Sequence, residues 1–247
     1  MKKRLIPVLQ LNGRKLVKTR DLRDPIYIGD PINACRIFSE KNASEILLCN
    51  IKGSKDRIID FEHLEEICSE SFVPLAYIGG VSQITDFDRL FGMGIEKVGV
   101  DQLLLTKPEI VEDAVRKYGS SSVMASITVQ KTRFRGNYFA RSVNNVASKF
   151  ELSDALNIAK DAGCGEFVIH ASYNEGTYRG IDDVLVSRLP LWLNNYPVTY
   201  MGGIGSESDV GDVFESTFFT GVGLGSLCVF SGQRSGILVR YPNLSYS

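Results

Sequence analysis

The sequence has little of what marks a metal-binding, disulfide-rich or membrane protein. Its 247 residues include five cysteines but no CxxC pair, two histidines, one tryptophan and no apolar run long enough to span a bilayer. Widely spaced cysteines argue against a zinc site or a disulfide framework, so we interpret them as small buried side chains in a reducing compartment. The apolar stretch in MKKRLIPVLQ is too short for a signal peptide. A cytoplasmic protein with no metal and no other cofactor is therefore predicted.

Neither sign of charge is in excess. The chain has 28 Lys and Arg against 29 Asp and Glu, a net charge of -1, and 44% of its residues are hydrophobic. Proteins that bind nucleic acid or anionic membranes usually carry a basic surplus, so neither partner is expected. Local basic clusters can still bind a small anion.

Short apolar runs rich in β-branched residues alternate with helical patterns along the whole chain. Strands without a polar face are typical of parallel sheets covered by helices. Eight repeats favour one α/β domain over residues 1–247, a closed (β/α)8 TIM barrel, with a doubly wound sheet of five or six strands as the alternative. The expected strands are 4–10, 45–51, 74–79, 97–101, 122–129, 166–172, 197–202 and 218–225.

One sequence element occurs twice. YIGGVSQITDF at 77–87 returns as YMGGIGSESDV at 200–210, and a strand-start glutamate recurs at a similar offset of about 120 positions, half the chain. The repeat predicts a barrel built of two similar half-barrels.

The glycines of the repeated element follow strands three and seven, and GVGLGS at 221–226 follows strand eight. Glycine lets backbone N–H groups approach an anion, so a phosphate site is predicted beside strands seven and eight, with simple tight turns as the alternative.

The segments KRLIPVL, GDPINACRIFSE, IGGV, GCGEFVIHASYNEGT, YMGGIG and GLGS resemble, in order and spacing, the HisF family, the cyclase subunit of imidazole glycerol phosphate synthase. The resemblance implies a half-barrel-duplicated (β/α)8 barrel. It also implies a separate, HisH-like glutaminase subunit that releases ammonia at the bottom of the barrel. Ammonia would then pass through the barrel core to a phosphorylated small molecule at the top.

The chain departs from that family at its two catalytic aspartates. Gln10 and Thr128 stand at those positions, and no Asp or Glu occurs in residues 4–20 or 122–150. An amide or a hydroxyl does not titrate near pH 7, so the chain's own cyclase activity is predicted to be lost. The catalytic residues are left unknown. His170 ends the sixth strand and faces the pocket by strand alternation, as a catalytic candidate or as a structural histidine.

The resemblance assigns two further sets of residues. Charged residues that begin four strands match the family's ammonia gate, with solvated surface charges as the alternative: Arg4, Glu45, Lys97 and Glu166. Positions that match the family's substrate site are Lys18, Gly80, Asp101, Gly176, Thr177, Gly202, Gly203, Gly225 and Ser226. Asp101 replaces a family asparagine, and a carboxylate repels phosphate, so one phosphate or none is expected.

Three segments outside the strands carry further expectations. Residues 11–30 are expected to form a long, basic loop, either a lid over an anion or a solvated loop, and 131–142 a hairpin. The tail after GLGSLCVF is too short and too broken by Gly and Pro for a full eighth helix.

The tail, the GDPINA segment and the missing aspartates together resemble a HisF-like branch associated with surface-polysaccharide (lipopolysaccharide and O-antigen) sugar biosynthesis. That branch implies an N-acetyl sugar amidotransferase as a further partner. The leading hypothesis is an ammonia-conducting subunit of a glutamine amidotransferase complex. The alternatives are an authentic cyclase subunit of histidine biosynthesis and a non-catalytic phosphate-sugar binding module.

Overall fold

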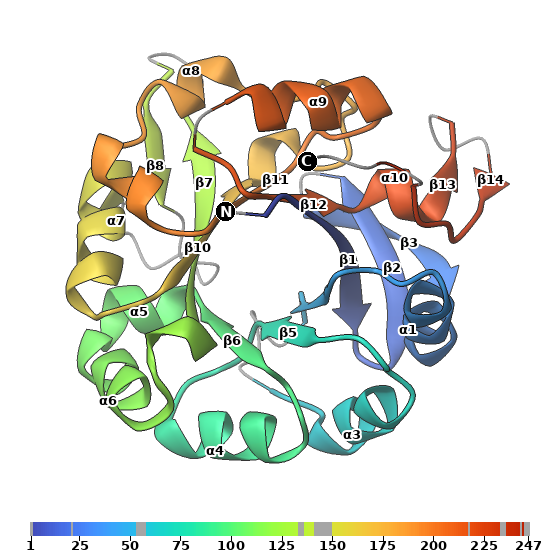
Figure 1. Cartoon of the computed structure of the whole chain (residues 1–247), viewed down its shortest axis with the longest axis horizontal. Coiled ribbons are helices and arrows are strands. Elements are labelled where there is room, and N and C mark those ends of the chain that lie inside the picture. The colour runs from blue at the N-terminus through green and yellow to red at the C-terminus, as the bar shows by residue number, and fades with distance from the viewer. Residues whose placement is uncertain are drawn as a thin grey trace.

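The computed structural model describes residues 2–20, 22–52, 58–132, 136–140, 150–216, 218–232, 236–242 and 244. Eight parallel strands close into a barrel, with helices around the outside (Figure 1). Closure is complete because β12 pairs with β1, placing Gly221 opposite Arg4. The (β/α)8 prediction is confirmed. The strands are β1 Arg4–Asn12, β4 Ile46–Asn50, β5 Leu75–Ile78, β6 Lys97–Val100, β7 Val123–Lys131, β10 Glu166–Ala171, β11 Val198–Met201 and β12 Gly221–Leu224.

The outer layer consists mainly of six helices: α1 Pro31–Glu40, α3 Phe61–Ser69, α4 Ile84–Gly92, α6 Pro108–Tyr118, α7 Leu152–Asp161 and α9 Glu207–Glu215. Short turns complete it: α5 Gln102–Thr106, α8 Asp183–Val186, α10 Ser226–Val229, and the 3-10 helices η1 Ser120–Ser122, η2 Ser172–Asn174 and η3 Leu191–Asn195. Residues 182–195 read as one helical pattern, but α8 and η3 are separate. Pro190 explains the break, because its ring removes a donor and disfavours helix at the preceding residue.

The repeated sequence element is repeated in structure. Gly80 and Gly203 both take left-handed backbone angles, φ 85° and 87°. The helix that follows each is closed by a capping box: the Asp86 carboxylate accepts from the Gln83 backbone N–H, and Asp209 accepts from Ser206 in the same way. Turns and helix caps that match at corresponding positions are expected for a barrel built of two similar halves.

Two apolar clusters fill the molecule. The larger lies between strands and helices, and its largest buried side chains include Tyr77 and Tyr200, which occupy matching places in the two halves. The smaller lines the inside of the barrel, where alternate residues of each strand point. Its buried members are Ile6, Val8, Leu47, Ala76, Ile78, Met124, Val168 and Met201. The barrel interior is therefore a packed apolar core with polar groups above and below it.

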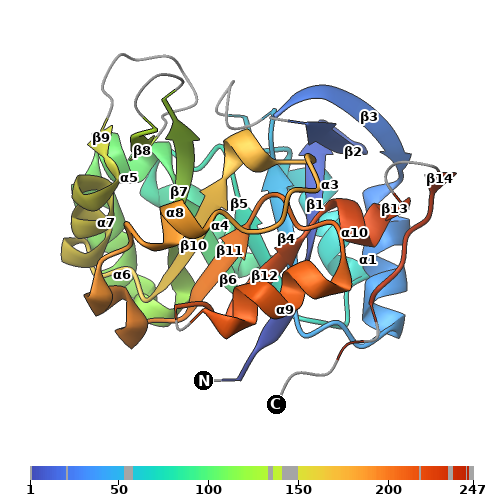
Figure 2. The same cartoon turned by 90° about the horizontal axis from the view of Figure 1, so that it is seen from above.

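The prediction of a long loop over residues 11–30 is wrong. These residues extend β1 and then form a hairpin, β2 Lys15–Arg20 and β3 Arg23–Gly29, at the top of the barrel (Figure 2). The two-residue turn between β1 and β2 is Gly13-Arg14, and Gly at its first position suits the positive φ of 61°. The basic residues of the hairpin do not act together: Lys18 is buried, whereas Arg14 pairs with Asp60 on the outside.

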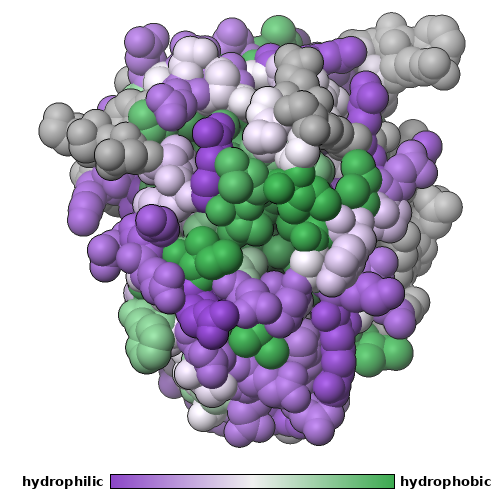
Figure 3. Space-filling view, turned by 90° about the vertical axis from the view of Figure 1, so that its right-hand side faces the viewer, coloured by the Kyte–Doolittle hydropathy of each residue, from purple (hydrophilic) through white to green (hydrophobic). Residues whose placement is uncertain are grey.

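The second hairpin prediction holds for the residues that can be described. β7 pairs antiparallel with β8 Tyr138–Ala140, and β9 Phe150–Glu151 follows; residues 133–135 and 141–142 of the predicted hairpin lie outside the described ranges. At the C-terminal end, four-residue α10 is followed by β13 Phe230–Ser231 and β14 Gly236–Ile237 instead of a long helix. On that side of the barrel Ile26, Ile237 and Leu238 stay exposed (Figure 3). Within the described ranges, no helix is long and apolar enough to cross a membrane.

Candidate functional site

The bottom of the barrel is closed by a ring of four charged side chains. Arg4 contacts Glu45 at 2.8 Å and Glu166 at 2.7 Å, and Lys97 contacts the same two carboxylates at 3.2 and 2.7 Å. Each member therefore has two partners of opposite charge. Burial disfavours the charged form of Arg4, but attraction to Glu166 and Glu45 outweighs it and raises the pKa of Arg4.

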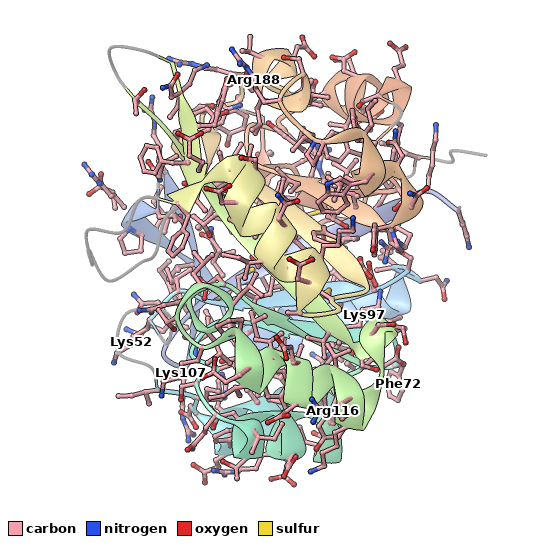
Figure 4. The ribbon with its side chains drawn as sticks, turned by 90° about the vertical axis from the view of Figure 1, so that its left-hand side faces the viewer. Lys52, Phe72, Lys97, Lys107, Arg116 and Arg188 are labelled. Atoms are coloured by element: carbon pink, nitrogen blue, oxygen red, sulfur yellow. The ribbon has the colours of Figure 1, made fainter. Side chains whose placement is uncertain are left out.

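The ring brings together the four residues that the sequence assigns to a gate. Lys97 is the most exposed member, with 23% of its side chain accessible, and lies at the same end of the barrel as Phe72 (Figure 4). The side chains of Glu45 and Glu166 are only 9% and 6% accessible. The geometry allows Lys97 to swing out while Arg4 still holds both carboxylates. Whether the ring admits ammonia stays a prediction.

A cavity of about 600 Å³ opens at the top of the barrel. It is lined by Gln10 and Thr128, the positions at which the resemblance predicts that catalytic aspartates are replaced, together with His170 and Asp101. The β2–β3 hairpin lies over it, since Leu22, Arg23, Asp24 and Pro25 also line it. The structure therefore places these four residues around one cavity, and their roles stay predictions.

Gln10 is held in a fixed orientation. Its side-chain oxygen accepts from the Thr19 backbone N–H at 2.8 Å and from the Thr19 hydroxyl at 3.0 Å. Its amide nitrogen donates to Glu175 at 3.3 Å. With both ends of the amide engaged, and only 3% of the residue exposed, Gln10 behaves as a structural group rather than a proton carrier.

Glu175 is the residue that sequence reasoning missed. It is 6% exposed, forms an ion pair with Lys18, and accepts a hydrogen bond from His170 Nε2 at 3.2 Å. Its carboxylate thus joins β1, β2 and β10. The available signal was a glutamate in ASYNEGT, directly after a barrel strand, where an acidic residue faces the pocket.

His170 is held in its neutral form. Burial lowers its pKa to about 4, and the nearby Lys18 charge adds to the effect. A neutral imidazole that donates through Nε2 keeps Nδ1 as an acceptor. The same shift makes His170 a weak base near pH 7, because a general base works best when its pKa lies near the operating pH.

The predicted phosphate site is compact. One small cavity at the ends of β10, β11 and β12 is lined by Lys18, by its ion-pair partner Glu175, and by Gly176, Gly202, Gly203, Gly225 and Ser226. Thr177 does not line it, because its hydroxyl donates to Asn174 at 2.6 Å. The buried Ser226 hydroxyl has no hydrogen-bond partner among the described residues. An orphan donor beside a lysine suits an anion.

The equivalent place in the other half is different. Gly80, Asp101 and Gln102 line a small hollow there, and Asp101 accepts from the Gln102 backbone N–H at 2.5 Å. Burial raises the pKa of the Asp101 carboxyl, although backbone hydrogen bonds oppose the shift. The Gln102 backbone N–H, which could otherwise donate to a phosphate, therefore donates to the Asp101 carboxylate instead. No group of three or more potential metal-ligating side chains occurs in the described part of the chain.

Comparison with known proteins places the chain in one family. The family model described as histidine biosynthesis protein matches residues 4–233. The chain is 35% identical over 250 residues to a Pseudomonas aeruginosa protein provisionally named imidazole glycerol phosphate synthase subunit hisF2, covering 99% of this chain and 98% of the relative. A Leptospira interrogans protein, provisionally named subunit HisF of that synthase, is 31% identical over 246 residues, covering 98% and 96%. Subunit HisF of Helicobacter hepaticus is 27% identical over 213 residues, covering 86% and 84%.

Proposed function

Because the chain belongs to the histidine biosynthesis protein family, we propose that it is the synthase-type subunit of a glutamine amidotransferase complex. In this proposal it takes ammonia from a partner glutaminase at the bottom of the barrel and delivers it to the cavity at the top. The four-membered ring of Arg4, Glu45, Lys97 and Glu166 is the observation that carries the proposal. Four charges that neutralise one another at the entrance of an apolar core favour a small uncharged passenger over an ion.

The top cavity supports transfer without the family's cyclisation. Gln10 and Thr128 supply no titratable group, and Gln10 is further fixed by Thr19 and Glu175. The compact site of Lys18 and Ser226 supports one phosphate at most, which would have to compete with Glu175 for Lys18, whereas Asp101 disfavours a phosphate in the other half. The acceptor we infer is a sugar bearing one phosphate group, and the pathway is a cytoplasmic sugar amidation with an N-acetyl sugar amidotransferase as the third component.

The surface for the glutaminase is the bottom face. Phe72 is 84% exposed and lies at the same end of the barrel as Lys97 of the ring (Figure 4). Leu191 is 79% exposed and begins η3, the segment that precedes β11. An exposed aromatic beside a charged opening is typical of a protein interface. Size-exclusion chromatography with the glutaminase encoded beside this chain tests the proposal, and an equimolar complex at micromolar concentration is expected.

Two variants sharpen the binding experiment. Phe72→Asp places a charge on the bottom face and is expected to weaken the complex by about tenfold or more. Ile237→Asp is the matched control, since it changes an exposed apolar residue of β14, which lies at the side of the barrel and away from the bottom face (Figure 2). If the wild-type chain forms no complex, or if both variants bind equally well, the assignment of this face is wrong.

A second candidate function is cyclisation by other residues. The pairing of His170 with Glu175 inside the cavity favours it, because an imidazole oriented by a carboxylate is a common proton acceptor. Turnover of the bis-phosphate substrate of the family with saturating ammonium distinguishes the two functions. We expect no detectable imidazole glycerol phosphate, since each lost acid–base group costs about 10²–10⁴-fold. Turnover within about tenfold of an ordinary family member, abolished by His170→Asn, would establish the cyclase instead.

A further inference from the structure

The inner wall of the top cavity carries an arc of polar side chains from three neighbouring strands. Asp101 directly follows β6, Ser126 and Thr128 belong to β7, His170 belongs to β10, and all four line the cavity. The register brings them side by side, since β6 pairs with β7 up to the residue before Asp101, and Thr128 is opposite His170. The arc therefore forms one continuous surface inside the cavity.

These groups have hydrogen-bonding capacity to spare, and most of it is acceptor capacity. The Asp101 carboxylate has about four lone-pair sites, and the backbone N–H groups of residues 101 and 102 occupy two of them. The hydroxyls of Ser126 and Thr128 have no hydrogen-bond partner among the described residues. His170 uses Nε2 as a donor, which leaves Nδ1 as an acceptor. A ligand that binds to this wall therefore has to supply donors.

The charges that line the cavity balance, and the cations lie at its rim. The lining cations are Arg23 and Lys52, both exposed, and the lining anions are Asp24 and Asp101. Lys52 lies at the end of the barrel opposite the ring (Figure 4). Burial lowers the pKa of His170 to about 4, so its ring is uncharged near pH 7. On the inner wall, the described lining residues thus offer one carboxylate and no cation, an arrangement that repels a phosphate.

From these features we propose that this half of the top cavity binds adjacent hydroxyl groups of a sugar ring, with Asp101 as their principal acceptor. A carboxylate accepts from sugar hydroxyls in other proteins too, as at the ribose of bound dinucleotides. Ser126 and Thr128, whose hydroxyls donate as well as accept, complete the site. A cavity of about 600 Å³ has room for such a ring. The inference rests on the proposed function and deepens it, because it makes Asp101 the residue that selects hydroxyl groups over a phosphate.

NMR titration of the whole chain with labelled Met and Ile methyl groups tests the site. The probes are glucose, glucose 6-phosphate and glucose 1,6-bisphosphate, at about pH 8, where each phosphate carries two charges. Ile78 and Met201 line the cavity and report binding, whereas Met93 follows α4 on the outside and is the reference. Glucose should shift Ile78 and Met201 saturably. The bisphosphate should bind about tenfold or more weaker than the monophosphate, since its second phosphate meets Asp101.

Two carboxylates of the same cavity give a matched pair of variants. Asp101→Asn keeps an oxygen that accepts from the Gln102 backbone N–H but removes the charge. It should weaken glucose binding by about tenfold, the effect of a hydrogen bond to a charged group, and should abolish the discrimination against the bisphosphate. Asp24→Asn makes the same change of charge at the exposed rim. It should alter either quantity by about twofold at most, because salt screens an exposed charge.

Equal effects of Asp101→Asn and Asp24→Asn would mean that the net charge of the cavity sets the preference, and the site at Asp101 would be wrong. It would also be wrong if the wild-type chain bound the bisphosphate more tightly than the monophosphate, or if glucose gave no saturable shift. A chain that binds glucose through Asp101 and yet forms no complex with its glutaminase would overturn the proposed function alone. A chain that forms the complex but fails the glucose titration would overturn only the sugar site.

Discussion

Among single residues, Lys18 and Glu175 form an ion pair inside the molecule. Both are buried, at 2% and 6% exposure, and each is the other's partner of opposite charge. Removing one partner leaves a buried charge uncompensated, so Glu175→Gln is expected to lower the free energy of unfolding by about 3 kcal/mol or more. The double variant Lys18→Met/Glu175→Gln should recover much of that loss. Urea unfolding of Glu175→Gln, Lys18→Met and the double variant measures it, and additive losses would show that the pair is not coupled.

His170 gives the protein a specific pH dependence. Its folded pKa of about 4 lies below its ordinary value of 6.5, so unfolding takes up a proton between these values. Falling pH therefore favours the unfolded state over this window, and the contribution is fully present only above about pH 6.5. In His170→Gln the loss of stability from pH 7 to pH 4 should be smaller than in the wild type. Thermal unfolding across that range checks it, and parallel curves would contradict it.

Among the secondary structure elements, Asp182 fastens the β7–β8 extension to the start of α8. Its carboxylate accepts from Tyr173 at 2.7 Å, Tyr138 at 2.9 Å and Lys131 at 3.0 Å. Burial would raise its pKa, but these hydrogen bonds outweigh burial and lower the pKa of Asp182 to about 2. The stabilisation is therefore complete above about pH 4 and is lost as pH falls through about 2.

Asp182→Asn is accordingly expected to cost about 1–3 kcal/mol at neutral pH. Because the bonds join one hairpin to one helix, the loosening should be local. Amide hydrogen exchange is predicted to accelerate at Phe139 and Ala140 while β10 and β11 keep their protection. Uniform acceleration across the barrel would instead indicate that the whole fold depends on this carboxylate.

The elements also show how far the sequence predicts the structure. All eight barrel strands were predictable because short apolar runs rich in β-branched residues and glycine turns are local signals. The β2–β3 hairpin was missed because its position over the barrel has no local signal, although Gly13 indicates a turn after β1. Glu175 was missed for a similar reason: its importance depends on Lys18, which only the hairpin brings to it.

At the scale of the whole molecule, the ring at the bottom of the barrel is proposed to couple the partner glutaminase to the cavity at the top. Lys97→Ala removes the most exposed member and leaves Arg4 bound to both carboxylates, so the fold should be stable. Amination of the natural acceptor should then no longer follow glutamine hydrolysis, whereas external ammonium should still serve. The ratio of aminated product to glutamate is the measurement. Arg116→Ala, on the outer side of the barrel (Figure 4), is the control and should keep the wild-type ratio. An unchanged ratio in Lys97→Ala would exclude a gate at this ring.

Both ends of the described chain emerge at the bottom of the barrel, on the face where Arg4 begins β1 (Figure 2). A glutaminase tethered to either end by a short flexible linker would therefore meet the ring without having to reach around the helices. Such a tether raises the effective concentration of a partner to the millimolar range. A single-chain fusion is thus geometrically permitted at both ends, whereas a bulky affinity tag at either end would crowd the docking face.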